Sequence, residues 1–217
     1  MSLVVQTLSE QIFTLVRDRI ITGKIAANAA VKQDALAAEL GCSKIPLREA
    51  FVRLEQEGLL VSQANRGYFV KPMTADEVEE IYALRLKLEP DAVAKAALYA
   101  DEAQRLAAKD ALAALDAANG QGVHEVGKLN RLFHLSLVLP QDALTYQILE
   151  RLNVMSERYV SRHLEPPGRE DNAHIEHVKL LDAWLSGNDK LAASLCHTHL
   201  IGSLSDLRRE FVTSAVA

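Results

Sequence analysis

Residues 36–59 read LAAELGCSKIPLREAFVRLEQEGL, and this stretch decides the fold of the N-terminal third of the chain. The apolar residues before Gly41 predict a short helix over 33–40, which the glycine ends. Ser43 can cap a following helix that carries Pro46 in its first turn, where a missing N–H costs little. Two short helices joined by a tight turn predict a helix-turn-helix.

The flanking segments complete a winged form of this motif. Apolar residues at helical spacing predict an amphipathic helix over 6–22. Runs typical of β-strands, 59–61 and 68–70, flank the turn-rich residues 62–67 and predict a hairpin. We therefore expect a winged helix-turn-helix domain over residues 1–72.

The rest of the chain shows only helical patterns. Six helices are expected, at about 74–98, 101–118, 123–139, 143–162, 169–186 and 189–213. The predicted fold class is mostly α, an N-terminal winged helix-turn-helix followed over residues 73–217 by an all-α helical bundle.

The charge of the 217-residue chain is unevenly spread. Its formal net charge is −5, but residues 1–72 hold nine Lys or Arg against seven Asp or Glu. Only this first third is suited to face nucleic-acid phosphates. No long uncharged apolar run is present, and several charged residues fall within the first 25 positions, where a signal peptide would be apolar. We therefore expect a cytoplasmic protein without a membrane partner.

Cations mark one face of the second motif helix. Lys44 and Arg48 lie four residues apart near its N-terminus, where long cations can reach phosphates or guanine edges. Arg66 falls at the hairpin tip, a position suited to a backbone or minor-groove contact. The same three cations are also compatible with an ordinary solvated surface.

Residues 36–59 closely resemble the DNA-binding signature of the GntR superfamily of regulators, and NRGYFV at 65–70 resembles its wing. The resemblance implies a homodimer on double-stranded operator DNA, with contacts from Ser43, Lys44, Ile45, Arg48, Arg66 and Gly67. Several residues depart from the family pattern, among them Ala27 and Asn28 in place of the usual Pro-Gly. Lys44 replaces an arginine, Ile45 replaces a threonine, and Asp34 stands where a basic residue is common.

Histidine spacing points to a metal site. His177 lies 11 residues before Asn188 and His199 lies 11 after it, so an antiparallel helix hairpin would bring both imidazoles to one level. Asn130 and His134, four residues apart, share a helix face. Three imidazoles and an oxygen donor suit a divalent ion such as zinc or nickel. Alternatively, each histidine is an ordinary interior or surface residue.

NRLFH at 130–134, the pair 176–177 and His199 match the ligand pattern of the FCD effector domain of FadR-type members, in the smaller six-helix, VanR-like form. The resemblance implies that Asn130, His134, His177 and His199 hold the metal. His174 is a possible competing ligand or an outer residue. The others, His124, His163 and His197, match nothing and are expected at the surface.

Arg85 and Glu89 are similar to an Arg-x-x-x-Glu pair of the first FCD helix. An effector carboxylate that bridges the metal and Arg85 is one hypothesis. An intrahelical Arg–Glu pair explains the spacing equally well.

The sequence thus predicts a DNA-binding transcription regulator whose operator binding responds to a small organic acid at or near a metal ion. A regulator that senses metal alone is the main alternative. A metal-dependent hydrolase is disfavoured, and we expect no enzyme, because no zinc-protease, nucleophile-elbow or phosphate-loop motif is present.

Overall fold

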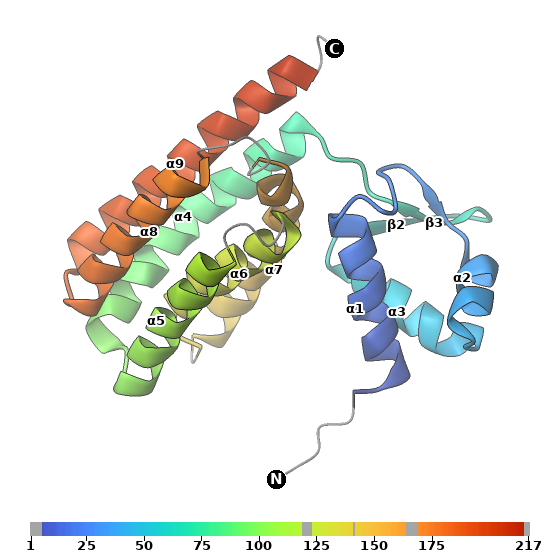
Figure 1. Ribbon diagram of the computed structural model, residues 1–217, viewed down its shortest axis with the longest axis horizontal. Helices are drawn as coiled ribbons and strands as arrows, with labels where there is room; N and C mark the ends of the chain where they lie inside the picture. Colours follow the sequence, from blue (N-terminus) through green and yellow to red (C-terminus); the bar gives the residue numbers. More distant parts are fainter. Residues whose placement is uncertain (1–5, 119–122, 141, 164–168, 215–217) are drawn as a thin grey trace. The chain divides into compact units, whose positions relative to one another are not determined.

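The computed structural model describes residues 6–118, 123–140, 142–163 and 169–214. The chain divides into two compact units, an N-terminal unit, Met1–Met73, and a C-terminal unit, Thr74–Ala217. Short helices and strands build the first unit and long helices build the second (Figure 1). None of the described helices is long and apolar enough to cross a membrane.

The N-terminal unit packs helices against a small antiparallel sheet. Its elements are α1 (Leu8–Ile21), β1 (Ala30–Val31), α2 (Gln33–Leu40), α3 (Lys44–Gln56), β2 (Leu60–Gln63) and β3 (Gly67–Val70). The strand order is β1-β3-β2, and Ala30 pairs with Phe69. The hairpin and the three helices were expected, but β1 was not. A two-residue strand is too short to show an alternating pattern in the sequence.

The inner face of α3 fixes this helix in the unit. Leu47, Phe51 and Leu54 are fully buried, and the ring of Phe51 lies edge-on to that of Tyr68 with centroids 5.2 Å apart. Gly41 ends α2 with φ of 62°, a left-handed conformation that favours glycine and turns the chain into α3. The opposite face of α3 is consequently left at the surface.

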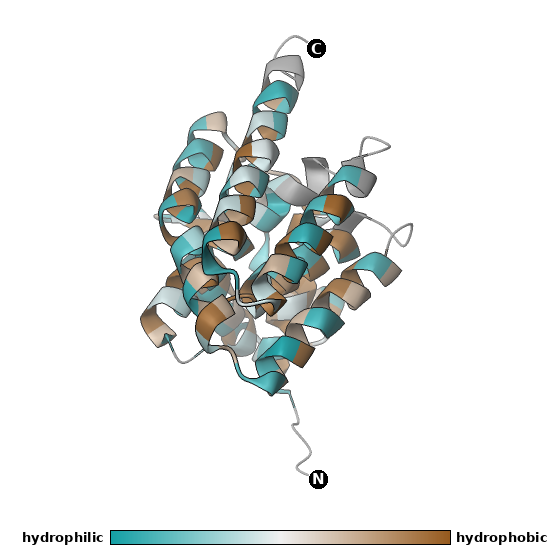
Figure 2. Ribbon diagram, turned by 90° about the vertical axis from the view of Figure 1, so that its left-hand side faces the viewer, coloured by the Kyte–Doolittle hydropathy of each residue, from teal (hydrophilic) through white to brown (hydrophobic). Residues whose placement is uncertain are grey.

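The C-terminal unit consists, in its described residues, of six helices, and the predicted fold class is confirmed. They are α4 (Ala75–Tyr99), α5 (Glu102–Ala117), α6 (Val123–Ser136), α7 (Ala143–His163), α8 (Arg169–Leu185) and α9 (Asp189–Ser214). Brown and teal bands alternate along these helices in Figure 2, as expected for helices with one buried face.

Helix α6 ends three residues before the expected 139. The amides of Leu137 and Val138 bond to carbonyls three residues back, those of His134 and Leu135, so the last turn tightens ahead of Pro140. Residues 137–139 are nevertheless buried, and their apolar character extends the helical pattern past the end of the helix.

Polar contacts join α4 and α7 along much of their length. From the C-terminal end of α4 to its start they are Lys95–Asp142 at 2.8 Å, where Asp142 immediately precedes α7, Arg85–Ser156 at 3.0 Å and Glu77–Tyr159 at 2.6 Å. The Tyr159 hydroxyl also accepts from the backbone N–H of Thr74, the residue that caps α4. Helix α7 is thereby tied to the first residue of the C-terminal unit.

Candidate DNA-binding face and metal centre

The N-terminal end of α3 presents an exposed polar and apolar face. Ser43, Lys44, Ile45 and Arg48 all lie at the surface, and the Ile45 side chain is 71% exposed. Ser43 occupies the N-cap position, but its side chain makes no capping hydrogen bond, contrary to the capping role expected for it. The extended backbone at Ser43 instead leaves this hydroxyl at the surface.

Two cations of this face differ in their surroundings. The ammonium of Lys44 lies 2.6 Å from a carboxylate oxygen of Asp34 at the start of α2. Within the described part of the chain, Arg48 has no ion pair or side-chain hydrogen bond. Arg48 is thus the cation of α3 whose guanidinium is fully available to a partner.

The hairpin tip carries the other two residues predicted to contact DNA. Arg66, in the turn between β2 and β3, and Gly67, the first residue of β3, are exposed. The guanidinium of Arg66 lies 5.2 Å from the ring centre of Phe69. Asn65 and Gly67 have φ of 60° and 88°, so two left-handed residues make the tight tip. The wing therefore holds Arg66 in an exposed turn with its guanidinium near an aromatic ring.

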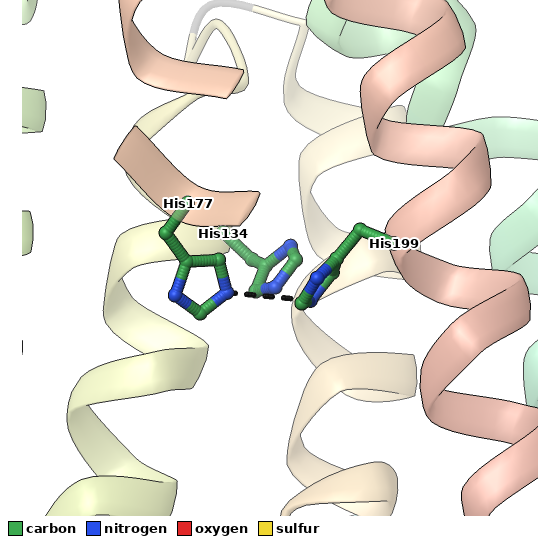
Figure 3. Close-up of side chains that lie close together, drawn as sticks. All are labelled: His134, His177 and His199. Carbon is green, nitrogen blue, oxygen red and sulfur yellow. Dashed lines mark hydrogen bonds between the residues drawn. The ribbon is translucent and has the colours of Figure 1, made fainter. Parts of the chain in front are cut away.

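Three imidazoles converge in the interior of the C-terminal unit. His134 on α6, His177 on α8 and His199 on α9 are buried, and one ring nitrogen of each lies within 4.8 Å of the others. The Nε2 atoms of His177 and His199 are 3.3 Å apart. Figure 3 shows the three rings facing a common centre from separate helices. The hairpin of α8 and α9 brings two of these rings to the same level, and α6 supplies the third.

Carboxylates orient two of these rings from behind. The Nδ1 atom of His134 lies 2.7 Å from Glu89, and that of His199 lies 2.7 Å from Glu176. A histidine that gives Nδ1–H to a carboxylate presents Nε2 as its free ligand atom. Burial lowers the pKa of His134 to about 4, against the opposing effect of Glu89, and lowers the pKa of His177 well below its ordinary value. Both rings are therefore held in the neutral form that binds metals.

A cavity of about 360 Å³ opens on the cluster. All three histidines line it, together with Asn130, which is half-buried one turn before His134. His174 also lines the cavity, but its Nδ1 atom lies 2.6 Å from Asp116 on α5 and it is not among the converging rings. His197 is exposed, while the side chains of His124 and His163 lie outside the described residues.

Arg85 is buried at the cavity wall and forms the intrahelical pair with Glu89. Its Nε and one terminal nitrogen donate to the Glu89 carboxylate at 2.8 and 3.0 Å, and the other terminal nitrogen donates to Ser156. Although burial opposes it, Arg85 together with His134 keeps the pKa of Glu89 below its usual range. Glu89 is therefore an ionised carboxylate shared between a guanidinium and an imidazole.

Sequence reasoning missed the oxygen partners of this site. Glu89 was noted only for its spacing from Arg85, and Glu176 only for its place beside His177. No pattern in the sequence indicated that Ser156 and Asn153 on α7 belong to this site. In the structure Asn153 donates to Glu89 at 3.4 Å. Contacts between separate helices are set by packing, which a single-helix pattern does not encode.

The chain matches two family models. Residues 8–70 match the model described as bacterial regulatory proteins of the gntR family, and residues 80–202 match the FCD domain. The chain belongs to the GntR family of bacterial regulatory proteins, and its C-terminal unit carries an FCD domain.

Curated relatives of this chain bear the name of transcriptional regulator. The chain is 30% identical to the HTH-type transcriptional regulator BphR of Paraburkholderia xenovorans, over 94% of this chain and 87% of that protein. It is 36% identical to the Nta operon transcriptional regulator of Aminobacter aminovorans, over 57% and 58%. The fold is similar to that of Escherichia coli McbR, with a TM-score of 0.80 at 21% identity over 95% and 100% of the two chains. The chain is a DNA-binding transcription regulator.

Proposed function

We propose that this regulator binds operator DNA as a homodimer and that a small organic acid, bound at or near a divalent metal ion, modulates the binding. On DNA the contacts come from Ser43, Lys44, Ile45, Arg48, Arg66 and Gly67. The sensory half rests on one observation, the convergence of three buried imidazoles within 4.8 Å on the wall of a cavity.

The donor set fits a metal ion of the zinc or nickel class. His134, His177 and His199 offer neutral nitrogens, and Asn130 offers an amide oxygen from the same cavity wall. Carboxylates behind His134 and His199 are the outer partners that metal-binding histidines commonly have. When bound, the ion supplies a positive centre that attracts a carboxylate.

Arg85 is the protein group proposed to hold the effector. A guanidinium has five N–H donors, and Glu89 and Ser156 take three of those of Arg85. Two N–H donors of Arg85 remain, and Arg85 lines the cavity. A small carboxylate that accepts from them would lie beside the histidine cluster, in a cavity large enough for a small molecule.

The same helix that carries Arg85 begins the C-terminal unit. Helix α4 starts directly after the 70–74 linker, and Thr74 at its cap is held by Tyr159 of α7. Ser156, one turn earlier on α7, bonds to Arg85. Occupancy at Arg85 can thus bias the linker through the α4–α7 contact, and we propose the linker as the hinge.

A homodimer follows from the geometry of DNA reading. One winged helix-turn-helix covers a single half-site and offers few contacts, whereas a two-fold dimer places two α3 helices in successive major grooves. Light scattering of the full chain with and without duplex should give a dimer mass. A concentration-independent monomer on DNA would contradict the proposal.

Metal sensing without an organic effector is the second candidate. It is favoured by the engagement of Arg85 with Glu89 and Ser156, which leaves only part of the guanidinium for a ligand.

One experiment separates the two candidates. Metal content is measured by elemental analysis, and carboxylates are screened by thermal shift with zinc-loaded, nickel-loaded and chelator-treated protein. An acid that stabilises only the metal-loaded protein, and changes its affinity for duplexes selected from a random pool, supports the favoured function. A metal that changes DNA affinity while no acid has an effect supports the second. Protein that binds neither metal nor acid would overturn both.

A further inference from the structure

An ion pair links the two helices of the helix-turn-helix at their N-terminal ends. The ammonium nitrogen of Lys44, the first residue of α3, lies 2.6 Å from a carboxylate oxygen of Asp34 in the first turn of α2. The two side chains are 62% and 78% exposed. Ion pairs this exposed add little to folding stability, so its importance lies in the surface that it forms.

This pair lies on the face proposed to bind DNA. Lys44 is between Ser43 and Ile45 at the exposed end of α3, one turn before Arg48. In helix-turn-helix complexes the N-terminal residues of the second helix meet base edges, while the first helix crosses the backbone. A carboxylate bonded to the first residue of α3 therefore stands at the boundary with DNA.

A carboxylate at the boundary with DNA is tolerated only beside a hydrogen-bond donor. Phosphates and base-edge acceptors repel it, and removing the carboxylate from water without giving it a donor costs free energy. The cytosine N4 amino group is the major-groove donor that aspartate accepts from, and lysine donates to guanine O6 and N7. In a C·G base pair the cytosine amino group and the guanine acceptors are neighbours. A carboxylate and an ammonium held 2.6 Å apart can therefore meet them side by side, the carboxylate at cytosine and the ammonium at guanine.

We infer that Asp34 and Lys44 act together to read one C·G base pair in each operator half-site. Lys44 supplies the donor for guanine and Asp34 the acceptor for cytosine. Asp34 also disfavours guanine and thymine at the cytosine position, because their major-groove edges give its carboxylate no donor. Adenine offers its N6 amino group there, but the thymine paired with it gives Lys44 only O4 in place of O6 and N7 of guanine. The inference rests on the proposed DNA-binding face, and it makes Asp34 a specificity-determining residue of this chain.

The test selects duplexes from a random pool with full-length wild-type protein and with Asp34→Asn, Lys44→Ala and Glu39→Gln. Glu39→Gln is the matched control, since it removes the same charge from α2 but from a pair with Arg19. We expect wild type and Glu39→Gln to select C·G at one symmetric pair of positions. Asp34→Asn and Lys44→Ala should lose about tenfold discrimination there.

Affinity for an unselected duplex gives a second readout. Asp34→Asn should bind it more tightly than wild type and with a steeper salt dependence, because Lys44 becomes free for a phosphate. Thermal unfolding checks that each variant folds.

Two results would overturn the inference. One is an unchanged base preference in Asp34→Asn, whether or not its affinity for all duplexes rises. The other is a loss of preference that Glu39→Gln shares. Arg48→Ala distinguishes these two results from failure of the proposed DNA-binding face itself. If Arg48→Ala binds DNA as tightly as wild type, the face does not contact DNA.

Discussion

The Nδ1 atom of His134 and the Oε1 atom of Glu89 lie 2.7 Å apart in the interior of the C-terminal unit, 45 residues apart in the chain. Glu89 also accepts two hydrogen bonds from Arg85. The buried carboxylate of Glu89 thus connects Arg85, the residue proposed to bind the effector, to His134, a proposed metal ligand. A change in the charge around either partner alters the hydrogen bonding available to the other.

Removal of the free cation of α3 should weaken DNA binding. We expect Arg48→Ala to lower affinity for selected duplexes and, for a phosphate contact, to reduce the slope of log K against log salt by about 0.9. Arg208→Ala is the matched control, because Arg208 is exposed on α9 in a pair with Glu79. Titrations at two salt concentrations that show equal affinity for Arg48→Ala and wild type would refute the assigned face.

Histidine variants test the proposed metal centre. His177→Ala and His199→Ala should each lose bound zinc or nickel and lower the Tm of metal-loaded protein, since each removes one of three converging nitrogens. His197→Ala should do neither, because His197 is exposed on the same helix as His199. Equal metal content in the three variants would show that the cluster does not bind metal.

The outer carboxylate of His199 should tune metal affinity. Glu176→Gln keeps the size of the side chain but removes the charge that accepts from Nδ1 of His199. We expect a loss of roughly 10- to 100-fold in metal affinity by chelator competition. Glu79→Gln, which disrupts the exposed pair with Arg208, is the control and should retain wild-type affinity. Unchanged affinity in Glu176→Gln would mean that this carboxylate has no part in metal binding.

Asn130 gives a prediction of definite sign. An amide oxygen is neutral, so three imidazoles and Asn130 leave the double charge of the ion uncompensated by direct ligands. Asn130→Asp should therefore tighten metal binding against a chelator and weaken carboxylate binding to metal-loaded protein. Calorimetry on the two proteins measures both. If the aspartate variant binds metal no better, Asn130 is not a ligand.

The metal-free protein should lose stability in mild acid. Burial lowers the pKa of His134 to about 4 and that of His177 well below its ordinary value, whereas unfolded histidines titrate near pH 6.5. The unfolded chain therefore binds more protons below about pH 6.5, and the free energy of unfolding falls as the pH drops from there toward 4. Chelator-treated protein should show a lower Tm at pH 5 than at pH 7.5. His177→Ala should show a smaller drop, and a wild-type Tm that is constant or higher at pH 5 would contradict the prediction.

Local patterns in the sequence determined much of this protein. Helical periodicity and its breaks located five of the six C-terminal helices to within one residue at each end. The exception, α6, ends early because the buried residues 137–139 continue its apolar pattern through a tighter turn. The signature over 36–59 identified the helix-turn-helix because its turn, cap and core positions all lie within one short segment.

Spacing about the α8–α9 turn predicted that His177 and His199 lie at one level, but the tertiary structure decided most other contacts between side chains of separate elements. The pairing of β1 with β3, of Glu89 with His134, of Glu176 with His199 and of Asp34 with Lys44 joins separate elements. Residue spacing predicts neighbours along one helix, where 3.6 residues make a turn, but it carries no information on how two helices are rotated against each other. That rotation is set by the packing of the buried apolar faces, and it placed two carboxylates behind the histidine cluster.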